Sequence, residues 1–214
     1  MAILAEISEN LQKGKAKLVK ELVEQALAEG LEALDILQNG LMPGMDVIAV
    51  KFQNNEVFVP EVLIAARAMK MGAEVLKPHL DEASAMIGKA IIGTVKGDLH
   101  DIGKNLVRMM LEGKGIEAID LGVDVSPEQF LEAYYEHKPD LVMLSALLTT
   151  TMGEMKNTVD AFTQAGVRDQ VVIMIGGAPI TDSFCREAGA DFYTADAASA
   201  AETAKNAILQ RRAA

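Results

Sequence analysis

The fold is decided by residues 90–103, which read Ala-Ile-Ile-Gly-Thr-Val-Lys-Gly-Asp-Leu-His-Asp-Ile-Gly. The first six residues form an apolar run of the kind that makes a buried strand in a parallel sheet. A polar loop follows, and a helix is predicted over about 104–113. A strand, a loop and a helix in this order begin a β-α-β unit.

The same alternation continues along the chain. Further strands are predicted at 117–121, 140–145, 171–175 and 191–194, with helices near 127–137, 152–165, 182–188 and 198–211. Ser126 and Pro127 mark a helix start, with a capping hydroxyl followed by proline at the first helical position. Five strands that alternate with helices predict an α/β fold, with a parallel, doubly wound, flavodoxin/Rossmann-like sheet.

Residues before this region have the apolar period of helices, as at Leu4, Ile7 and Leu11. One helix is predicted to stop at Asn39-Gly40, and the longest to start at Pro60. Apolar stripes of this kind need neighbouring helices, so a small bundle is expected. The stretch 80–89 is interpreted as a linker. The predicted domains are a helical bundle over 1–88 and an α/β domain over 89–214.

Composition narrows the function. Half of the 214 residues are hydrophobic and the net charge is −11, which argues against a nucleic-acid partner. The single cysteine, Cys185, excludes an intramolecular disulfide. The apolar runs are too short to span a membrane, and the start of the sequence does not have the pattern of a secretory signal. A cytoplasmic protein without a membrane partner is therefore expected.

The loop after the first strand has the residues of a metal-ligand site. His100 can reach a metal beyond the sheet while Asp98 holds its other ring nitrogen. Gly103 leaves room for a bulky ligand beside the backbone. Asp101 is expected to cap the next helix. Lys104, His79 and His137 are expected to lie at the surface, in contact with solvent. The alternative for His100 is an ordinary loop histidine.

Two further motifs close predicted strands, where open α/β sheets bind ligands. They are Ser145-Ala146-Leu147 and Gly176-Gly177, the second of which also suits a plain strand-to-helix turn. The ordered set Asp-x-His-x-x-Gly, Ser-x-Leu and Gly-Gly resembles the cobalamin-binding signature of corrinoid proteins. Residues 93–105 look very like the corresponding segment of methionine synthase. The chain is also similar to small corrinoid proteins of methyltransferase systems for methanol, methylamines, betaines or aryl methyl ethers.

This resemblance implies roles for individual residues. His100 would be the lower axial ligand of cobalt, oriented by Asp98, with Thr151 in place of the serine that completes the relay in methionine synthase. Phe58 would cover the upper face of the corrin as part of the helical cap. The remaining positions expected to bind the cofactor, several of them around its nucleotide tail, are Asp101, Ile102, Gly103, Ser145, Leu147, Thr149, Gly176, Gly177 and Tyr193.

The function that the resemblance implies is that of a methyl carrier without autonomous activity. Co(I) would accept a methyl group from a donor-specific methyltransferase, and methyl-Co(III) would pass it to a second methyltransferase that uses a folate or a thiol coenzyme. A reductive-activation protein would be a third partner. The alternatives are a cobalamin-dependent sensor or regulator, the small subunit of a cobalamin-dependent mutase, and, on fold alone, a nucleotide- or flavin-binding protein.

Overall fold

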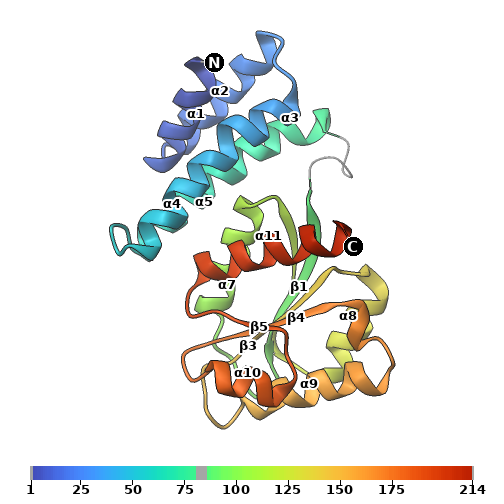
Figure 1. Ribbon diagram of the computed structural model, residues 1–214. Coiled ribbons are helices and arrows are strands. Elements are labelled where there is room, and N and C mark those ends of the chain that lie inside the picture. Colours follow the sequence, from blue (N-terminus) through green and yellow to red (C-terminus); the bar gives the residue numbers. More distant parts are fainter. Residues whose placement is uncertain (1, 81–85, 214) are drawn as a thin grey trace. The chain divides into compact units, whose positions relative to one another are not determined.

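The computed structural model describes residues 2–80 and 86–213 of the chain (Figure 1). It divides into two compact units, Met1–Met86 together with Glu112–Gly115, and Ile87–Leu111 together with Ile116–Ala214. Part of the predicted linker, residues 81–85, lies outside the described residues. The domain boundary between residues 88 and 89 therefore stays a proposal.

The first unit is built from helices. They are α1 (Ala2–Gln12), α2 (Ala16–Ala28), α3 (Ala33–Ile36), a π-helical turn (Leu37–Leu41), α4 (Met42–Gln53), α5 (Val59–Leu76) and a 3₁₀ turn (Lys77–His79). The predicted stripe of α1 is buried at Ile3, Leu4, Ile7 and Leu11, because α2 and α4 pack against it. In the described part of the chain, no helix is both long and apolar enough to cross a membrane.

The predicted helix stop at Asn39-Gly40 is wrong. The backbone stays helical there, and the π-helical turn leads directly into α4. Gly40 is buried, and a Cβ at this position would lie 3.4 Å from side-chain atoms of Leu4 and Ile7. Gly44, one turn later, packs still more closely, since a Cβ there would lie 3.0 Å from a side-chain atom of Leu11. These glycines let two helices approach each other. In the sequence alone, a glycine with this packing role looks the same as one that ends a helix.

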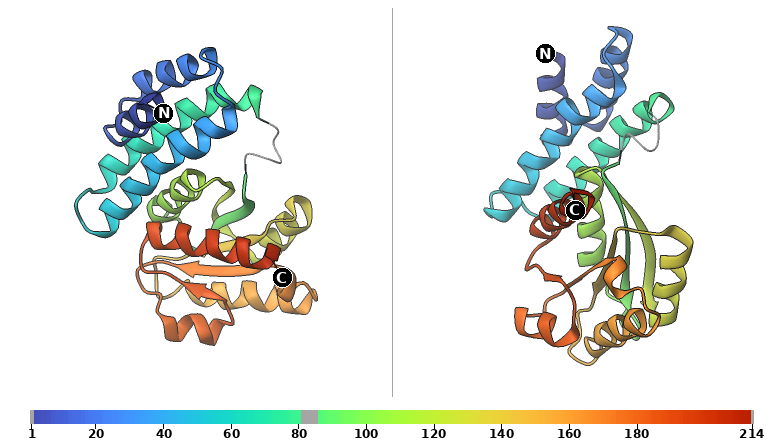
Figure 2. Two further views of the ribbon diagram at one scale, coloured as in Figure 1. Left: turned by 45° about the horizontal axis from the view of Figure 1, so that its top comes forward. Right: turned by 45° about the vertical axis from the view of Figure 1, so that its right-hand side comes forward.

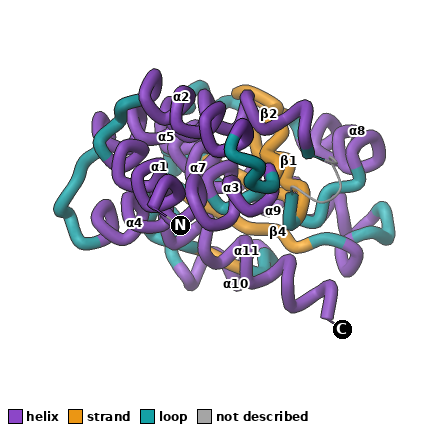
Figure 3. The backbone as a smooth tube through the Cα atoms, turned by 90° about the horizontal axis from the view of Figure 1, so that it is seen from above, coloured by secondary structure: helices purple, strands orange, loops and turns teal. Residues whose placement is uncertain are grey.

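The second unit contains the strands β1 (Gly88–Val95), β2 (Ile116–Val125), β3 (Leu141–Ser145), β4 (Val172–Gly176) and β5 (Phe192–Tyr193). They form one parallel sheet in the order β2-β1-β3-β4-β5, which confirms the predicted fold class. All of these strands lie in the second unit (Figure 3). The order is that of flavodoxin-like sheets.

Helices cover both faces of the sheet (Figure 2). On one face lie α7 (Ile102–Gly113) and α11 (Ala197–Ala213), and on the other α8 (Pro127–His137), α9 (Gly153–Gln164) and α10 (Asp182–Ala188). Ser126 caps α8 as predicted, since its hydroxyl accepts the Gln129 N–H. Phe130 and Phe162 are fully buried among the strands and these helices. The sheet is thus a packed scaffold with helices on both faces.

The edge strand β2 extends to Val125, four residues beyond its predicted end. Its pairing with β1 is irregular, because Ile92 pairs with Asp120 whereas Gly93 pairs with Gly122. Gly122 and Asp124 both have left-handed backbone, with φ of 88° and 56°. These extra residues are bulges, which bend an edge strand and redirect its end.

We expect Gly177→Ala to destabilise the protein by about 1–3 kcal/mol, the cost of one strained backbone position. Gly177 has φ +137°, and a Cβ there would lie only 1.8 Å from the Ala146 carbonyl oxygen. Urea unfolding measures the change. The control is Gly153→Ala in the first turn of α9, where a Cβ meets nothing within 4 Å. Equal stability of the two variants would show that the ends of β3 and β4 are loosely packed.

Candidate functional site

The site lies where the strand order reverses. In the order β2-β1-β3-β4-β5, successive strands are added on opposite sides of β1, so the loops after β1 and β3 diverge. Ligands of open α/β sheets bind in the crevice at the carboxyl ends of such a pair of strands. Asp98 and His100 follow β1, and Leu147 and Thr151 follow β3. Topology therefore brings together residues that are about 50 positions apart.

Asp98 and His100 form a hydrogen-bonded pair. One carboxylate oxygen of Asp98, Oδ1, accepts the backbone N–H of His100 at 3.0 Å and lies 2.7 Å from its ring Nδ1. The Asp98 side chain is fully buried, whereas the His100 side chain is 50 % exposed. The carboxylate therefore fixes one nitrogen of the ring from below while the ring itself remains accessible.

The second oxygen of Asp98, Oδ2, binds the loop after β3. It accepts the backbone N–H groups of Leu147 at 2.8 Å and Leu148 at 3.2 Å, and the hydroxyl of Thr151 at 2.8 Å. The Thr151 oxygen also lies 3.0 Å from the Leu148 carbonyl. Threonine thus reaches the carboxylate at the position where the resemblance implies a serine. Asp98, His100 and Thr151, predicted to act together, are in contact.

These bonds determine the charge state of the pair. Burial raises the pKa of Asp98, but the hydrogen bonds from Leu147, His100 and Thr151 outweigh it and hold this pKa well below its usual range. Asp98 is therefore ionised at neutral pH, and Nδ1 of His100 carries the proton that it donates. In the neutral ring this leaves the lone pair on Nε2, the nitrogen that can bind a metal.

Thr94 and Asp124, which the sequence analysis does not select, support the loop. The loop begins with the turn 95–98, which is closed by a bond from the Asp98 N–H to the Val95 carbonyl and has φ +78° at Gly97. The Thr94 hydroxyl donates to the carbonyl of His100 at 2.9 Å. Asp124 at the end of β2 accepts the Gly97 N–H at 2.7 Å. Because β2 was predicted to end at residue 121, only the Gly122-x-Asp124 pattern could have indicated this contact.

Exposed apolar side chains lie next to the pair in the chain. Leu99 and Ile102 flank His100 and are 71 % and 76 % exposed. Leu147 and Leu148, whose amides bind Asp98, also expose large parts of their side chains. At Gly103 a Cβ would meet nothing within 4 Å, so this position is open. An accessible imidazole with apolar neighbours fits a large, mostly apolar ligand that takes one metal bond from the protein.

The other predicted site residues are spread over the carboxyl ends of the strands. Ser145 ends β3, Gly176 ends β4, and Tyr193 in β5 pairs with Ile175. Gly177 follows β4 and Thr149 lies in the exposed loop after β3. The backbone of Gly177 packs on Ala146, which gives this glycine a structural reason in addition to the predicted one. Phe58 is the residue before α5 and is 63 % exposed.

The expectation for Lys104 is wrong. Its side chain is 2 % exposed, and its ammonium group donates to Asp120 of β2 and to Asn105. The amphipathic period of α7 places this lysine against β2, where the carboxylate compensates the buried charge. Asp101 is the residue before α7, and its carboxylate accepts the Asn105 side-chain amide at 3.0 Å, while its capping role stays a prediction. His79 is exposed and His137 half-buried, in line with surface positions.

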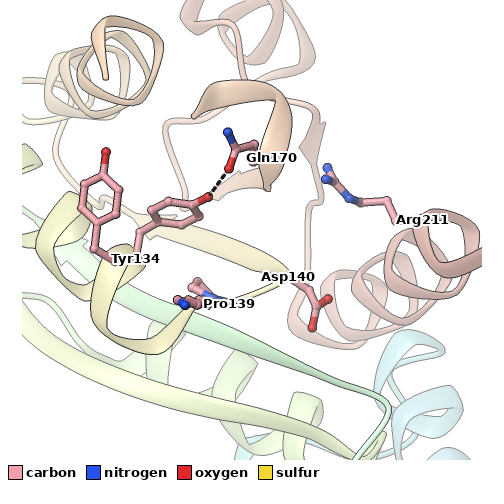
Figure 4. A pocket seen from close by; sticks show the side chains of 7 residues that line it. Tyr134, Pro139, Asp140, Gln170 and Arg211 are labelled. Carbon is pink, nitrogen blue, oxygen red and sulfur yellow. Dashed lines mark hydrogen bonds between the residues drawn. The ribbon is translucent and has the colours of Figure 1, made fainter. Parts of the chain in front are cut away.

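A cavity of about 390 Å³ lies at the opposite rim of the sheet (Figure 4). It is formed where α8 ends and β3 and β4 begin, and the Tyr134 hydroxyl donates to Gln170 within it. Its lining residues are Tyr134, Tyr135, Lys138, Pro139, Asp140, Gln170 and Arg211. Because this cavity lies at the amino ends of β3 and β4, whereas Asp98 and His100 follow the carboxyl end of β1, it is separate from their site.

Comparison with known families agrees with the motifs. A family profile described as a B12 binding domain matches residues 88–204, and a second B12 binding domain profile matches residues 3–77. The chain belongs to the B12-binding family. Cobalamin, the cofactor predicted from the sequence, is thereby confirmed, together with the interpretation of the chain as a small corrinoid protein.

Relatives match this B12-binding chain over nearly its full length. Trimethylamine corrinoid protein 2 of Methanosarcina acetivorans is 39% identical and is covered over 96% of both chains. The dimethylamine corrinoid protein of Methanosarcina barkeri is 37% identical over 96% of this chain and 97% of its own. A chain of the methanol:cobalamin methyltransferase complex from Methanosarcina barkeri superimposes with a TM-score of 0.88 at 29% identity, over 97% of this chain and 80% of that chain.

We expect Asp98→Asn to lower the free energy of unfolding of the cofactor-free protein by about 1–3 kcal/mol at neutral pH, since a neutral amide cannot replace all the bonds of the buried carboxylate. Because the pKa of Asp98 is lower in the folded than in the unfolded chain, its stabilising effect is complete above the unfolded value and is lost as pH falls toward the folded one. The difference between wild type and variant should therefore narrow below about pH 4.

Urea unfolding at a series of pH values measures this difference. The control is Asp101→Asn, which changes an exposed carboxylate on the same loop that accepts the Asn105 side-chain amide. It should alter stability by less than about 0.5 kcal/mol at any of these pH values. A difference between wild type and Asp98→Asn that stays constant into the acid range would contradict the ionised state of Asp98.

Proposed function

We propose that this chain is the methyl-carrying corrinoid subunit of a methyltransferase system, with a methylamine as the source of the methyl group. The single observation that carries the proposal is the Asp98–His100 pair at the edge of the sheet. In this pair the buried Asp98 carboxylate is ionised, and the His100 ring is accessible. Matches to trimethylamine and dimethylamine corrinoid proteins over nearly the full length support the same function. Cobalamin supplies the chemistry when bound, since its cobalt can carry a methyl group.

In this proposal His100 would hold the cobalt of cobalamin through Nε2. Asp98 keeps the proton on Nδ1, and its negative charge strengthens the imidazole as a ligand. Thr151 donates to Asp98 and so couples the ligand to the loop after β3. Because bonds from two loops hold the carboxylate, the ring position is preorganised before the cofactor binds.

The other predicted residues are proposed as contacts of the cofactor. Leu99 is added to the predicted set given below, because it is exposed beside His100 as the predicted residue Ile102 is. The predicted tail contacts lie at the carboxyl ends of β3, β4 and β5, where loops can line a crevice. The set is Phe58, Asp101, Ile102, Gly103, Ser145, Leu147, Thr149, Gly176, Gly177 and Tyr193.

The proposed partners are a methylamine-specific methyltransferase, a second methyltransferase with a folate or thiol coenzyme, and a reductive-activation protein. A methyltransferase complex that contains a chain of the same fold supports the first of these. Methanol, betaines and aryl methyl ethers were also compatible with the motifs. The methylamine names among the relatives are the reason to favour a methylamine.

Loading the protein with hydroxocobalamin, followed by desalting, tests cofactor binding directly. We expect wild type and His100→Gly to retain corrin absorbance, and the variant to lose the absorption bands of imidazole-ligated cobalt. His79→Gly, at an exposed histidine in the 3₁₀ turn of the first unit, is the control and should match wild type. Absence of corrin absorbance after desalting, or a spectrum of His100→Gly that equals wild type, would refute the assignment.

The methyl donor is tested with purified partners. The reduced, loaded protein is mixed with the trimethylamine, dimethylamine or methanol methyltransferase of Methanosarcina and the matching donor, and methyl transfer to the protein is followed by absorbance. We expect transfer to be at least tenfold faster with one of the methylamine enzymes than with the methanol enzyme. Faster transfer with the methanol enzyme would contradict the proposed donor class.

A further inference from the structure

The loop that carries Asp98 and His100 is held at its outer side by a single residue of the neighbouring strand. Asp124, at the end of β2, makes two hydrogen bonds to the turn 95–98. Its carboxylate Oδ1 accepts the Gly97 N–H at 2.7 Å, and its own N–H donates to the Asp98 carbonyl at 3.0 Å. One bond involves the peptide group before Asp98 and the other the carbonyl group of Asp98 itself. Together they restrain the backbone of Asp98 and therefore the direction of its side chain.

The contact requires an unusual backbone at the end of β2. Asp124 has φ 56°, a left-handed conformation that aspartate and asparagine adopt more readily than other non-glycine residues. The bulges between Asp120 and Val125 create this conformation, since β2 has extra residues opposite β1 there. The distorted end of β2 thus brings one carboxylate to the turn and leaves its backbone N–H facing the same turn.

The turn itself needs this support. Its positive φ at Gly97, the third of its four residues, is that of a type II turn, and one backbone bond closes it, from the Asp98 N–H to the Val95 carbonyl. The Gly97 N–H points away from that bond, toward Asp124. Thr94 restrains the loop from its other end through the His100 carbonyl. Without Asp124, the loop would keep the Asp98–Val95 and Thr94–His100 hydrogen bonds but lose its hydrogen bonds to β2.

We propose that Asp124 is a positioning residue that acts on the metal ligand through the turn 95–98, and so sets how completely His100 occupies its ligating position. The proposal rests on the proposed function, because it concerns His100 as the axial ligand of cobalamin. The two hydrogen bonds of Asp124 described above both go to the turn. It acts by reducing the number of loop conformations that must be given up when the bond to cobalt forms.

The experiment compares Asp124→Gly, which keeps the left-handed backbone but removes the acceptor, with Asp124→Asn, which keeps both. Asp124→Ser, which replaces the carboxylate by a hydroxyl one bond closer to the backbone and so weakens the bond to Gly97, is a second loss variant in case glycine disturbs folding. Lys138→Gly is the matched control, since Lys138 also has left-handed backbone, with φ 46°, but lies at the end of α8. Thermal unfolding of each variant establishes that the fold is retained.

The first readout uses protein loaded with methylcobalamin. We expect the ratio of imidazole-ligated to unligated corrin, read from visible absorption, to fall about three- to tenfold in Asp124→Gly and Asp124→Ser, as the loss of one hydrogen bond allows. Asp124→Asn and Lys138→Gly should stay within about twofold of wild type. The second readout uses the cofactor-free protein, in which hydrogen exchange of the Gly97 amide should accelerate in the two loss variants alone.

The two readouts separate the possible failures. If wild-type protein shows no imidazole-ligated corrin while Gly97 exchange responds as expected, the proposed function fails and the support of the turn by Asp124 stands. If wild type is ligated and the loss variants keep its ratio, the positioning role is overturned. It is also overturned if Asp124→Asn loses ligation as strongly as Asp124→Gly, or if Lys138→Gly does.

Discussion

The site depends on one buried charge. Asp98 is enclosed at the carboxyl edge of the sheet, and a carboxylate can stay ionised in such a place only if hydrogen bonds replace the water that it loses. Donors from the loops after β1 and β3 meet this requirement together. The charge therefore joins two loops that the sheet topology would otherwise let diverge, and it fixes the tautomer of His100 as a consequence.

The Asp98 carboxylate lies between a packed core on one side and exposed side chains on the other. Behind the loops, the strands and the rings of Phe130 and Phe162 form a dense hydrophobic core. In front of them, the imidazole and the side chains of Leu99 and Ile102 remain accessible. A rigid scaffold that ends in an accessible ligand is the arrangement that holds a cofactor in one position. The bulged end of β2 adds a further restraint at the outer side of the loop.

Local sequence signals failed where a residue's neighbour is distant in the chain. Lys104 follows a polar motif and was placed in solvent, yet the fold pairs it with Asp120 of the adjacent strand. Asn39-Gly40 is a dipeptide typical of a helix stop, yet Gly40 lies inside a continuous helical segment and packs against α1. In both cases the side chain's role depends on an element that folds beside it. Charge and size alone carry no information about such a neighbour.

The sequence by itself determined the alternation of strands and helices, the parallel sheet, the cofactor and the association of Asp98 with His100. The alternation and the sheet follow from hydrophobic periodicity, and the Asp98–His100 pair from two residues close together in the chain. The cofactor and the place of Thr151 beside this pair follow from the resemblance of the spaced motifs to the cobalamin-binding signature. Only the tertiary structure decided that the Leu147 amide joins the Thr151 hydroxyl at the same carboxylate oxygen, and that Asp124 contacts the turn. Such contacts join separate loops, and they depend on strand order and on bulges that shift β2 relative to β1.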